Sequence, residues 1–199
     1  MGQEVREPKQ ERSIEKKNRI VRAGYELFSE AGYHSTNTAQ IAKRAGVSTG
    51  IVYGYFKDKH DILLDVLAIH LHNSFSPVFA LIDGLCAPIN YYALAKDVLD
   101  IAINLHKKSA KIHEALHSLS HSDASVNAKF IEIEDNLTLQ LSDRLASLGA
   151  DAPNLGERIH FAMNIVQSFS HEYVFDNHPY IDYAAMRTIV ESTLVALFI

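Results

Sequence analysis

The chain has no tryptophan and a single cysteine, Cys86. One cysteine excludes a disulfide within the chain, so the fold depends on its apolar core, and this usage suits a reducing cytoplasm. No apolar run approaches the roughly 18 residues that a membrane-spanning helix needs. The first twelve residues are rich in charge, which argues against a signal peptide. The sequence therefore predicts a cytoplasmic protein with no membrane partner.

Signatures of common enzymes are also scarce. The sequence has no glycine loop of the kind that cradles phosphate and no Cys-x-x-Cys pair. Glu132 and Glu134 are two apart on an expected helix, so they point to different sides and make a poor acid–base couple. We therefore expect no enzyme activity, no cofactor and no metal.

Basic residues are few overall, and they gather at one end. The chain carries 19 Lys or Arg against 24 Asp or Glu, a net charge of −5. Residues 1–60 nevertheless contain eleven basic and seven acidic residues, whereas the remainder contains eight and seventeen. This asymmetry places an end compatible with phosphate on an acidic body, as in proteins that bind nucleic acid through one domain.

Turn chemistry divides the basic end into three short helices. Gly32 is expected to end the first helix, because glycine adopts the left-handed conformation common after a helix C-terminus. Asn37 and Gln40 have capping-box spacing at the start of a second helix, which should stop at Gly46. The first helix carries a buried stripe at helical spacing, namely Ile20, Ala23, Leu27, Phe28 and Ala31.

The third helix should follow almost at once, with Ser48 as its N-cap, and should cover roughly Thr49 to Phe56. Two short helices joined by a glycine-containing turn are typical of a helix-turn-helix. Val52 and Phe56 would anchor this helix inward. The opposite face is small, since it presents Thr49, Gly50, Tyr53 and Gly54.

Glycine costs about 1 kcal/mol relative to alanine inside a helix, so two glycines here suggest close approach to a phosphate strand. The next helix opens near Asp58 and Lys59, where free amides and an ammonium group are expected to hold a phosphate oxygen.

These residues resemble the DNA-binding domain of the TetR family of bacterial transcriptional regulators. The matching positions include Phe28, Gly32, Tyr33, Thr36, Ile41, Ala42, Ala45, Gly46, Val47, Ser48, Gly50, Tyr53, Tyr55, Phe56 and Lys59. The resemblance implies DNA contacts from Thr36, Asn37, Ser48, Thr49, Gly50, Tyr53, Gly54, Tyr55 and Lys59. Three positions, Thr49, Ile51 and Gly54, depart from the family pattern, so base readout is expected to rest on thymine methyl groups or DNA shape.

The rest of the chain shows only helical patterns, which predicts an all-α fold of about nine helices. The expected organisation is a flexible arm over 1–12, a helix-turn-helix domain over 13–61, and a domain for effector binding and dimerisation over 62–199. Pro77, Gly84 and Pro88 should confine a short helix between turns. Later helices are expected at Tyr91–His106, Ser109–Ser120, within Ser122–Leu148, at Leu155–Phe175 and at Tyr183–Phe198.

The last two helices are apolar on more than one face, which requires burial on more than one side. The family resemblance implies a homodimer interface here, and burial within one subunit is the alternative. The residues expected in the interface are Phe161, Ile165, Phe169, Val190, Leu194 and Phe198.

Four histidines recur at spacings of seven, four and four: His106, His113, His117 and His121. On a continuous helix they would share a face, which suits a metal, a proton switch or the polar lining of an effector pocket. Ordinary surface histidines are the simplest alternative. The residues expected around an aromatic or lipophilic effector are Phe79, His106, His113, His117, Phe130 and Phe161.

The sequence thus predicts a homodimeric, ligand-responsive repressor that binds a palindromic DNA operator and is released by a small-molecule effector. A metal-binding sensor or enzyme that uses the histidine stripe is one alternative. A helical interaction module that no longer reads DNA is another.

Overall fold

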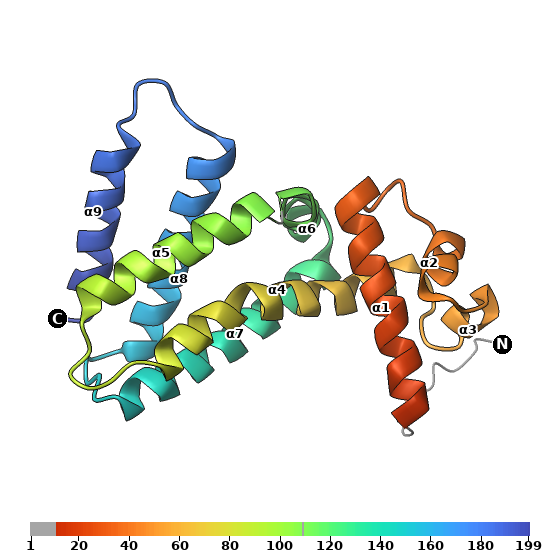
Figure 1. The fold of residues 1–199 in the computed structure, drawn as a ribbon, viewed down its shortest axis with the longest axis horizontal. Helices are drawn as coiled ribbons and strands as arrows, with labels where there is room; N and C mark the ends of the chain where they lie inside the picture. The colour runs from red at the N-terminus through yellow and green to blue at the C-terminus, as the bar shows by residue number, and fades with distance from the viewer. Residues whose placement is uncertain (1–10, 109) are drawn as a thin grey trace. The chain divides into compact units, whose positions relative to one another are not determined.

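The structure is a computed structural model and describes residues 11–108 and 110–199. Within these ranges it contains nine helices and no strand (Figure 1). They are α1 (Glu11–Ala31), α2 (Thr38–Ala45), α3 (Thr49–Tyr53), α4 (Lys59–Asp83), α5 (Tyr91–Lys108), α6 (Ala110–Ser122), α7 (Ala124–Ser147), α8 (Leu155–Phe175) and α9 (Tyr183–Ala196). The predicted all-α class and helix number are confirmed.

Two compact units make up the described chain. The first holds the described residues up to Leu71 and those from 110 to 130, and the second holds residues 72–108 and 131–199. Helices α4 and α7 contribute to both units. The predicted domain boundary between residues 61 and 62 falls near the start of α4, at a different place from this division.

The core of the first unit forms where α1 packs against α2 and α6. Ile20 and Phe28 of α1, Ile41 of α2 and Val52 of α3 are all almost fully buried. Each such side chain contributes about 1.5–3 kcal/mol by leaving water. The apolar stripe predicted for the first helix is thus buried at Ile20, Ala23 and Phe28, whereas Leu27 is half-buried and Ala31 is exposed.

The second unit is built around α5, which packs against α8 and α9. Leu99 and Ile103 of α5 meet Phe169 of α8 and Leu194 of α9 in one cluster of buried residues. A second cluster joins the end of α4 to α7 and α8 through Ile82, Leu141, Leu145 and Ile159.

Helix α4 corrects the prediction of a short helix between turns, because it continues through Pro77 to Asp83. A proline inside a helix costs about 3 kcal/mol, since it lacks the N–H and crowds the preceding turn. Here Phe75, Val78 and Phe79 flank it and pack against the second cluster. This burial offsets the cost that local chemistry predicts.

Helix α4 also corrects the expectation that no apolar run approaches the length of a membrane-spanning helix. An 18-residue window in α4 reaches a mean hydropathy of 1.3, so by length and composition alone the helix could cross a membrane. A third of that window is buried within the protein, including Ile62, Leu63, Val66 and Leu67. Core helices of ordinary folded domains satisfy the same criterion.

Other helix limits move by smaller amounts. Helix α1 begins at Glu11, inside the arm predicted over residues 1–12, and the rest of that arm lies outside the described residues. Helix α3 ends at Tyr53 rather than near Phe56. The amides of Gly54 and Tyr55 bond to carbonyl groups three residues back, which tightens the chain into a turn there.

Three of the predicted interface residues contribute to the core of their own subunit. Phe169, Val190 and Leu194 lie in the core cluster of the second unit and are at most 9% exposed. Their place in a dimer interface stays a prediction. Ile165 and Phe198 are half-buried, and Phe198 stacks on Tyr91. Phe161 is different, since 55% of it is exposed.

Candidate nucleic-acid interface

Helix α2 is fixed at both ends by the chemistry that the sequence predicts. The Asn37 side chain accepts from the Gln40 amide at 2.9 Å, and the Gln40 side chain accepts from the Asn37 amide at 2.8 Å. Gly46 ends the helix in the left-handed conformation, with a φ of +66°. The capping box is confirmed, and it occupies the Asn37 side chain from which a DNA contact was expected.

The third helix separates its two faces as predicted. Val52 and Phe56 are at most 3% exposed, whereas 44% of Tyr53 is exposed. We call the outer side of this segment the recognition face, and it consists of Ser48, Thr49, Gly50, Tyr53 and Gly54. Ser48 is the N-cap by position, but its side chain makes no capping hydrogen bond.

Packing inside the protein does not explain the glycine at position 50. A Cβ atom built there would meet only the Ser48 hydroxyl, at 4.0 Å. At Gly54 the nearest atom is the Ile51 carbonyl oxygen, at 3.3 Å, which is a tight approach. Among the described residues, no packing contact accounts for the glycine at position 50.

Both tyrosines near the recognition face are held by hydroxyl groups of other helices. The Tyr53 hydroxyl lies 3.1 Å from the Thr38 hydroxyl at the start of α2, and the Tyr55 hydroxyl lies 2.8 Å from the Ser13 hydroxyl of α1. These bonds fix the rings relative to the turn.

Residues 46–50 also match Gly-x-Ser-x-Gly, but the nucleophile elbow requires a strand before the serine, and α2 precedes it here.

Thr36 and Lys59, two residues from which the resemblance implies DNA contacts, make hydrogen bonds within the turn between α1 and α2. The Lys59 ammonium donates to the carbonyl oxygens of Tyr33 and Thr36, at 2.7 and 2.8 Å, and lies 4.2 Å from the centre of the Tyr33 ring. Burial lowers the pKa of Lys59. Thr36 is 3% exposed, and its hydroxyl donates to the Gly32 carbonyl at 2.9 Å. The Thr36 side chain thus lies inside the turn.

The start of α4 differs from the expectation of free amides. The Asp58 carboxylate accepts from the amides of His60 and Asp61, at 2.8 and 3.0 Å. A carboxylate at this position already satisfies the helix N-terminus and its dipole. A phosphate oxygen would have to compete with Asp58 for these two amides. The expectation that they are free to bind phosphate is therefore wrong.

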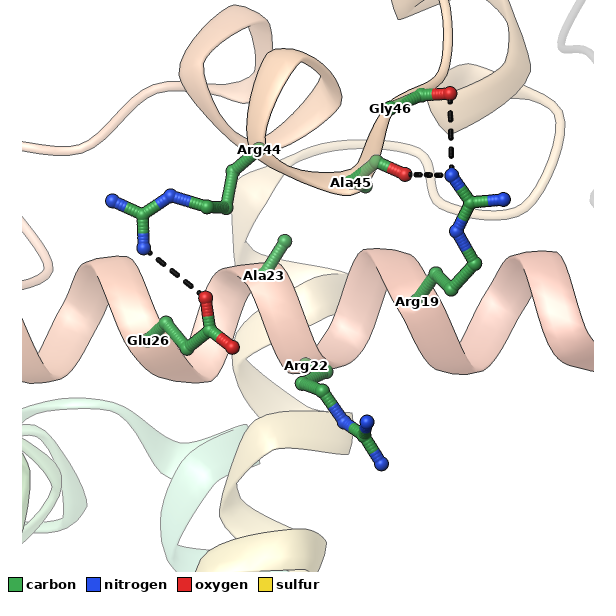
Figure 2. A pocket seen from close by; sticks show the side chains of 7 residues that line it. All are labelled: Arg19, Arg22, Ala23, Glu26, Arg44, Ala45 and Gly46. Atoms are coloured by element: carbon green, nitrogen blue, oxygen red, sulfur yellow. Dashed lines mark hydrogen bonds and ion pairs between the residues drawn. The ribbon is translucent and has the colours of Figure 1, made fainter.

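A hollow of about 230 Å³ lies between α1 and the end of α2 (Figure 2). Arg19 reaches from α1 to the carbonyl oxygens of Ala45 and Gly46, and Arg44 pairs with Glu26 at 3.1 Å. Arg22 extends away from both in this view. A cation at the carbonyl end of a helix is favourable. The contacts of Arg19 and Arg44 around this hollow thus hold α2 against α1.

A polar cluster that sequence reasoning missed joins the start of α4 to the start of α7 within the first unit. His60 Nε2 lies 2.8 Å from the Asp123 carboxylate, and the Ser125 hydroxyl donates to that carboxylate at 2.6 Å. Asp123 also caps α7 through the amides of Ser125 and Val126. The Ser125 hydrogen bond, followed by the helix amides, lowers the pKa of Asp123 to about 2. The only sign of this cluster in the sequence was an aspartate, Asp123, at a position where it can cap the start of a helix.

The predicted effector residues divide between the units. His113, His117 and Phe130 belong to the first unit, where the ring centres of His113 and His117 lie 5.2 Å apart and those of His117 and Phe130 lie 6.3 Å apart. His106 belongs to the second unit, as do the half-buried Phe79 and the exposed Phe161. His106 lies in the last turn of α5, whereas the other stripe histidines lie on α6, so the stripe spans two helices, in line with the separate helices expected at Tyr91–His106 and Ser109–Ser120.

Residues 113–117 also match His-Glu-x-x-His, a spacing that binds zinc in metalloproteases. Among the described side chains, no group of three ligand atoms within 4.8 Å of one another contains both His113 and His117. The motif is therefore not completed by a third ligand from that part of the chain.

Comparisons with known proteins agree with the helix-turn-helix. Residues 20–66 match the family model of bacterial regulatory proteins of the tetR family. The chain is 28% identical over 183 residues to the HTH-type transcriptional regulator HbdR of Aromatoleum sp. (strain CIB), covering 92% of this chain and 79% of HbdR. It is 35% identical over 87 residues to a fatty acid metabolism regulator protein of Bacillus subtilis, covering 44% of this chain and 41% of that protein.

A solved structure shows the same fold. The fatty acid degradation regulator FadR from Bacillus halodurans has a TM-score of 0.64 and 17% identity, with 95% of this chain and 97% of that chain covered. These proteins are transcriptional regulators rather than enzymes. The capped helix-turn-helix, the helical fold and the sequence matches lead to one conclusion: the chain carries a helix-turn-helix that matches the tetR family of bacterial regulatory proteins, and it is similar to transcriptional regulators of that kind.

Proposed function

We propose that the protein is a cytoplasmic, homodimeric repressor that binds a palindromic operator and leaves it when a small-molecule effector binds. The observation that carries the proposal is the recognition face, where Gly50 has no packing reason to be glycine. A flat face of this kind permits the backbone of α3 to approach a DNA strand closely. Base discrimination would then come from Thr49 and Tyr53 and from DNA shape.

The proposed dimer face uses the apolar side chains that α8 and α9 leave exposed. Phe161 is 55% exposed and Ile189 is 66% exposed. Large apolar side chains on the surface of a folded chain are typical of protein interfaces when they gather. A two-fold dimer would present two copies of α3 to successive turns of DNA, which is how a palindrome is read.

Helix α4 supplies the proposed coupling. It begins directly after the helix-turn-helix, and its residues 59–71 belong to the first unit while residues 72–83 belong to the second. An effector that binds the second unit would move the recognition helices apart by shifting α4. Such coupling requires the effector to bind the DNA-incompetent state more tightly.

We infer a lipophilic effector. Phe79 packs at the edge of the second core cluster. The B. subtilis relative and the B. halodurans structure are both named as regulators of fatty acid metabolism or degradation, which makes fatty acids the first probes.

Fluorescence anisotropy tests the proposal, with labelled DNA from the region upstream of the coding sequence, at two salt concentrations and with unlabelled competitor. We expect tight binding that resists competitor, weakens steeply with salt and is reversed by the effector. If any unlabelled DNA displaced the labelled probe equally well, the protein would not be a sequence-specific regulator of that region.

A further inference from the structure

One face of α1 carries positive charge past the point where the helix packs against α2. Residues four, seven and eleven positions apart share a face of an α-helix, because about 3.6 residues complete each turn. Arg12, Lys16, Arg19 and Ala23 have that spacing. Ala23 is 3% exposed beside α2, and Arg19 donates to two carbonyl oxygens at the end of α2 (Figure 2). The face that carries Arg12 and Lys16 is thus the face that meets α2.

Arg12 and Lys16 lie beyond the end of that contact. At a rise of about 1.5 Å per residue, Arg12 is about 16 Å along α1 from Ala23. Both cationic side chains are exposed. The Ser13 hydroxyl, next to Arg12, lies 2.8 Å from the hydroxyl of Tyr55, which follows α3. Because α2 and α3 lie on the same side of α1 (Figure 1), the two cations are directed to the side of α1 where α3 lies.

Neighbouring acids leave these two charges unpaired. Lys17, which points another way from α1, pairs with Asp65 at 2.7 Å. Within the described residues, Arg12 and Lys16 form no such ion pair. Glu15 lies at the edge of the same face, about 60° around the helix from Arg12. Exposed cations without an acid partner attract an external anion over roughly 8–10 Å at physiological salt.

We propose that Arg12 and Lys16 bind phosphates of the DNA backbone beside the segment that α3 reads. The proposal rests on the DNA-binding function proposed above. It adds α1 to the interface, since the resemblance assigns DNA contacts only to residues between 36 and 59. Arg12 and Lys16 are about 6 Å apart along α1, so each can hold a different phosphate. Contacts to phosphate carry no sequence information, so they raise affinity for every DNA sequence alike.

Fluorescence anisotropy with the labelled upstream DNA and with a random duplex tests this surface, at salt concentrations from about 50 to 200 mM. Each phosphate contact contributes about 0.9 to the slope of log affinity against log salt concentration. Arg12→Ala combined with Lys16→Ala should make that slope shallower by about 1.8. The deficit in affinity should therefore shrink about tenfold between 50 and 200 mM salt, and it should be the same for both duplexes.

Lys96→Ala combined with Lys108→Ala is the matched control. Both lysines are exposed on α5, and the double change removes the same net charge from the protein. This control should bind like the wild type. Arg12→Lys combined with Lys16→Arg keeps both charges and should retain the wild-type slope. Thermal unfolding of each variant checks that it is folded.

Three outcomes would overturn the proposal while the DNA-binding function stands. They are a wild-type slope in the alanine variant of Arg12 and Lys16, an equal loss in the α5 control, and a loss confined to one of the two duplexes. A wild-type protein that bound neither duplex in a salt-dependent manner would overturn the DNA-binding function itself, and the surface on α1 with it.

Discussion

The Lys59 ammonium group lies 2.7 Å from the carbonyl oxygen of Tyr33, across 26 residues of sequence. With its second bond to Thr36, it joins the start of α4 to the turn that precedes α2. Lys59 thus positions the helix-turn-helix whether or not it also contacts phosphate. An ammonium group has three donors, and these two bonds use two of them.

Lys59→Ala should lower both stability and DNA affinity. Loss of charged hydrogen bonds to two carbonyl oxygens costs about 1.5–3 kcal/mol in unfolding free energy. If the third donor holds a phosphate, affinity should fall for all DNA sequences alike. The slope of log affinity against log salt concentration should also become shallower by about one released ion. Denaturant titration and anisotropy measure the two effects. Lys57→Ala is the control for charge, and lower stability with unchanged affinity would confine Lys59 to a structural role.

Enlarging Gly50 should separate DNA binding from stability. A Cβ atom at this position meets only one distant hydroxyl, so Gly50→Ala should leave the fold intact or stabilise it by up to about 1 kcal/mol. Affinity should still fall, because the added carbon separates the backbone from DNA, and Gly50→Leu should weaken binding further. Anisotropy and thermal unfolding on the same samples check this. Equal affinity for all three residues would remove Gly50 from the interface.

Removing the Asp123 carboxylate should destabilise the first unit in a way that depends on pH. Its pKa is lowered from 3.8 to about 2, so the carboxylate stabilises the folded state above pH 4, and this contribution is lost as the pH falls through 4 toward 2. Asp123→Asn should therefore unfold at lower temperature than wild type at pH 7, with the difference shrinking below pH 4. Asp97→Asn is the control, as Asp97 is exposed on α5. A gap between Asp123→Asn and wild type that stays constant with pH would contradict the argument.

The exposed apolar residues of α8 and α9 should decide the oligomeric state. Phe161→Glu combined with Ile189→Glu places two charges on the proposed dimer face, and we expect a monomer by sedimentation with the fold retained. Leu139→Glu is the matched control, since Leu139 on α7 is 64% exposed. It should leave the dimer intact. Dimers that persist in the double variant would place the interface elsewhere.

Sequence reasoning was most accurate where one local interaction decides the structure. The Asn37–Gln40 capping box and the left-handed glycines at positions 32 and 46 need only a few neighbouring residues. In the structure, Asp182 caps α9 by the same kind of local interaction, through the amides of Ala184 and Ala185. The helix starting points and the helix-turn-helix follow from such signals.

It failed where burial by distant residues outweighs local preference. Pro77 indicates a break, yet α4 continues because its flanks pack against α7 and α8. Phe169, Val190 and Leu194 pack in one cluster with Leu99 and Ile103 of α5, and their own sequence does not reveal that partner. An apolar residue in a sequence reveals that it will be buried, and the partner that buries it depends on how the helices pack.

By itself, then, the sequence determined an all-helical chain with a capped helix-turn-helix and a small recognition face, because propensity, capping and hydrophobic periodicity are local properties. Tertiary structure alone decided that Lys59 supports the turn, that Asp123 joins α4 to α7, and that His106 faces His171. Those pairs are separated by 26, 63 and 65 positions, and only the packing of helices brings such residues together.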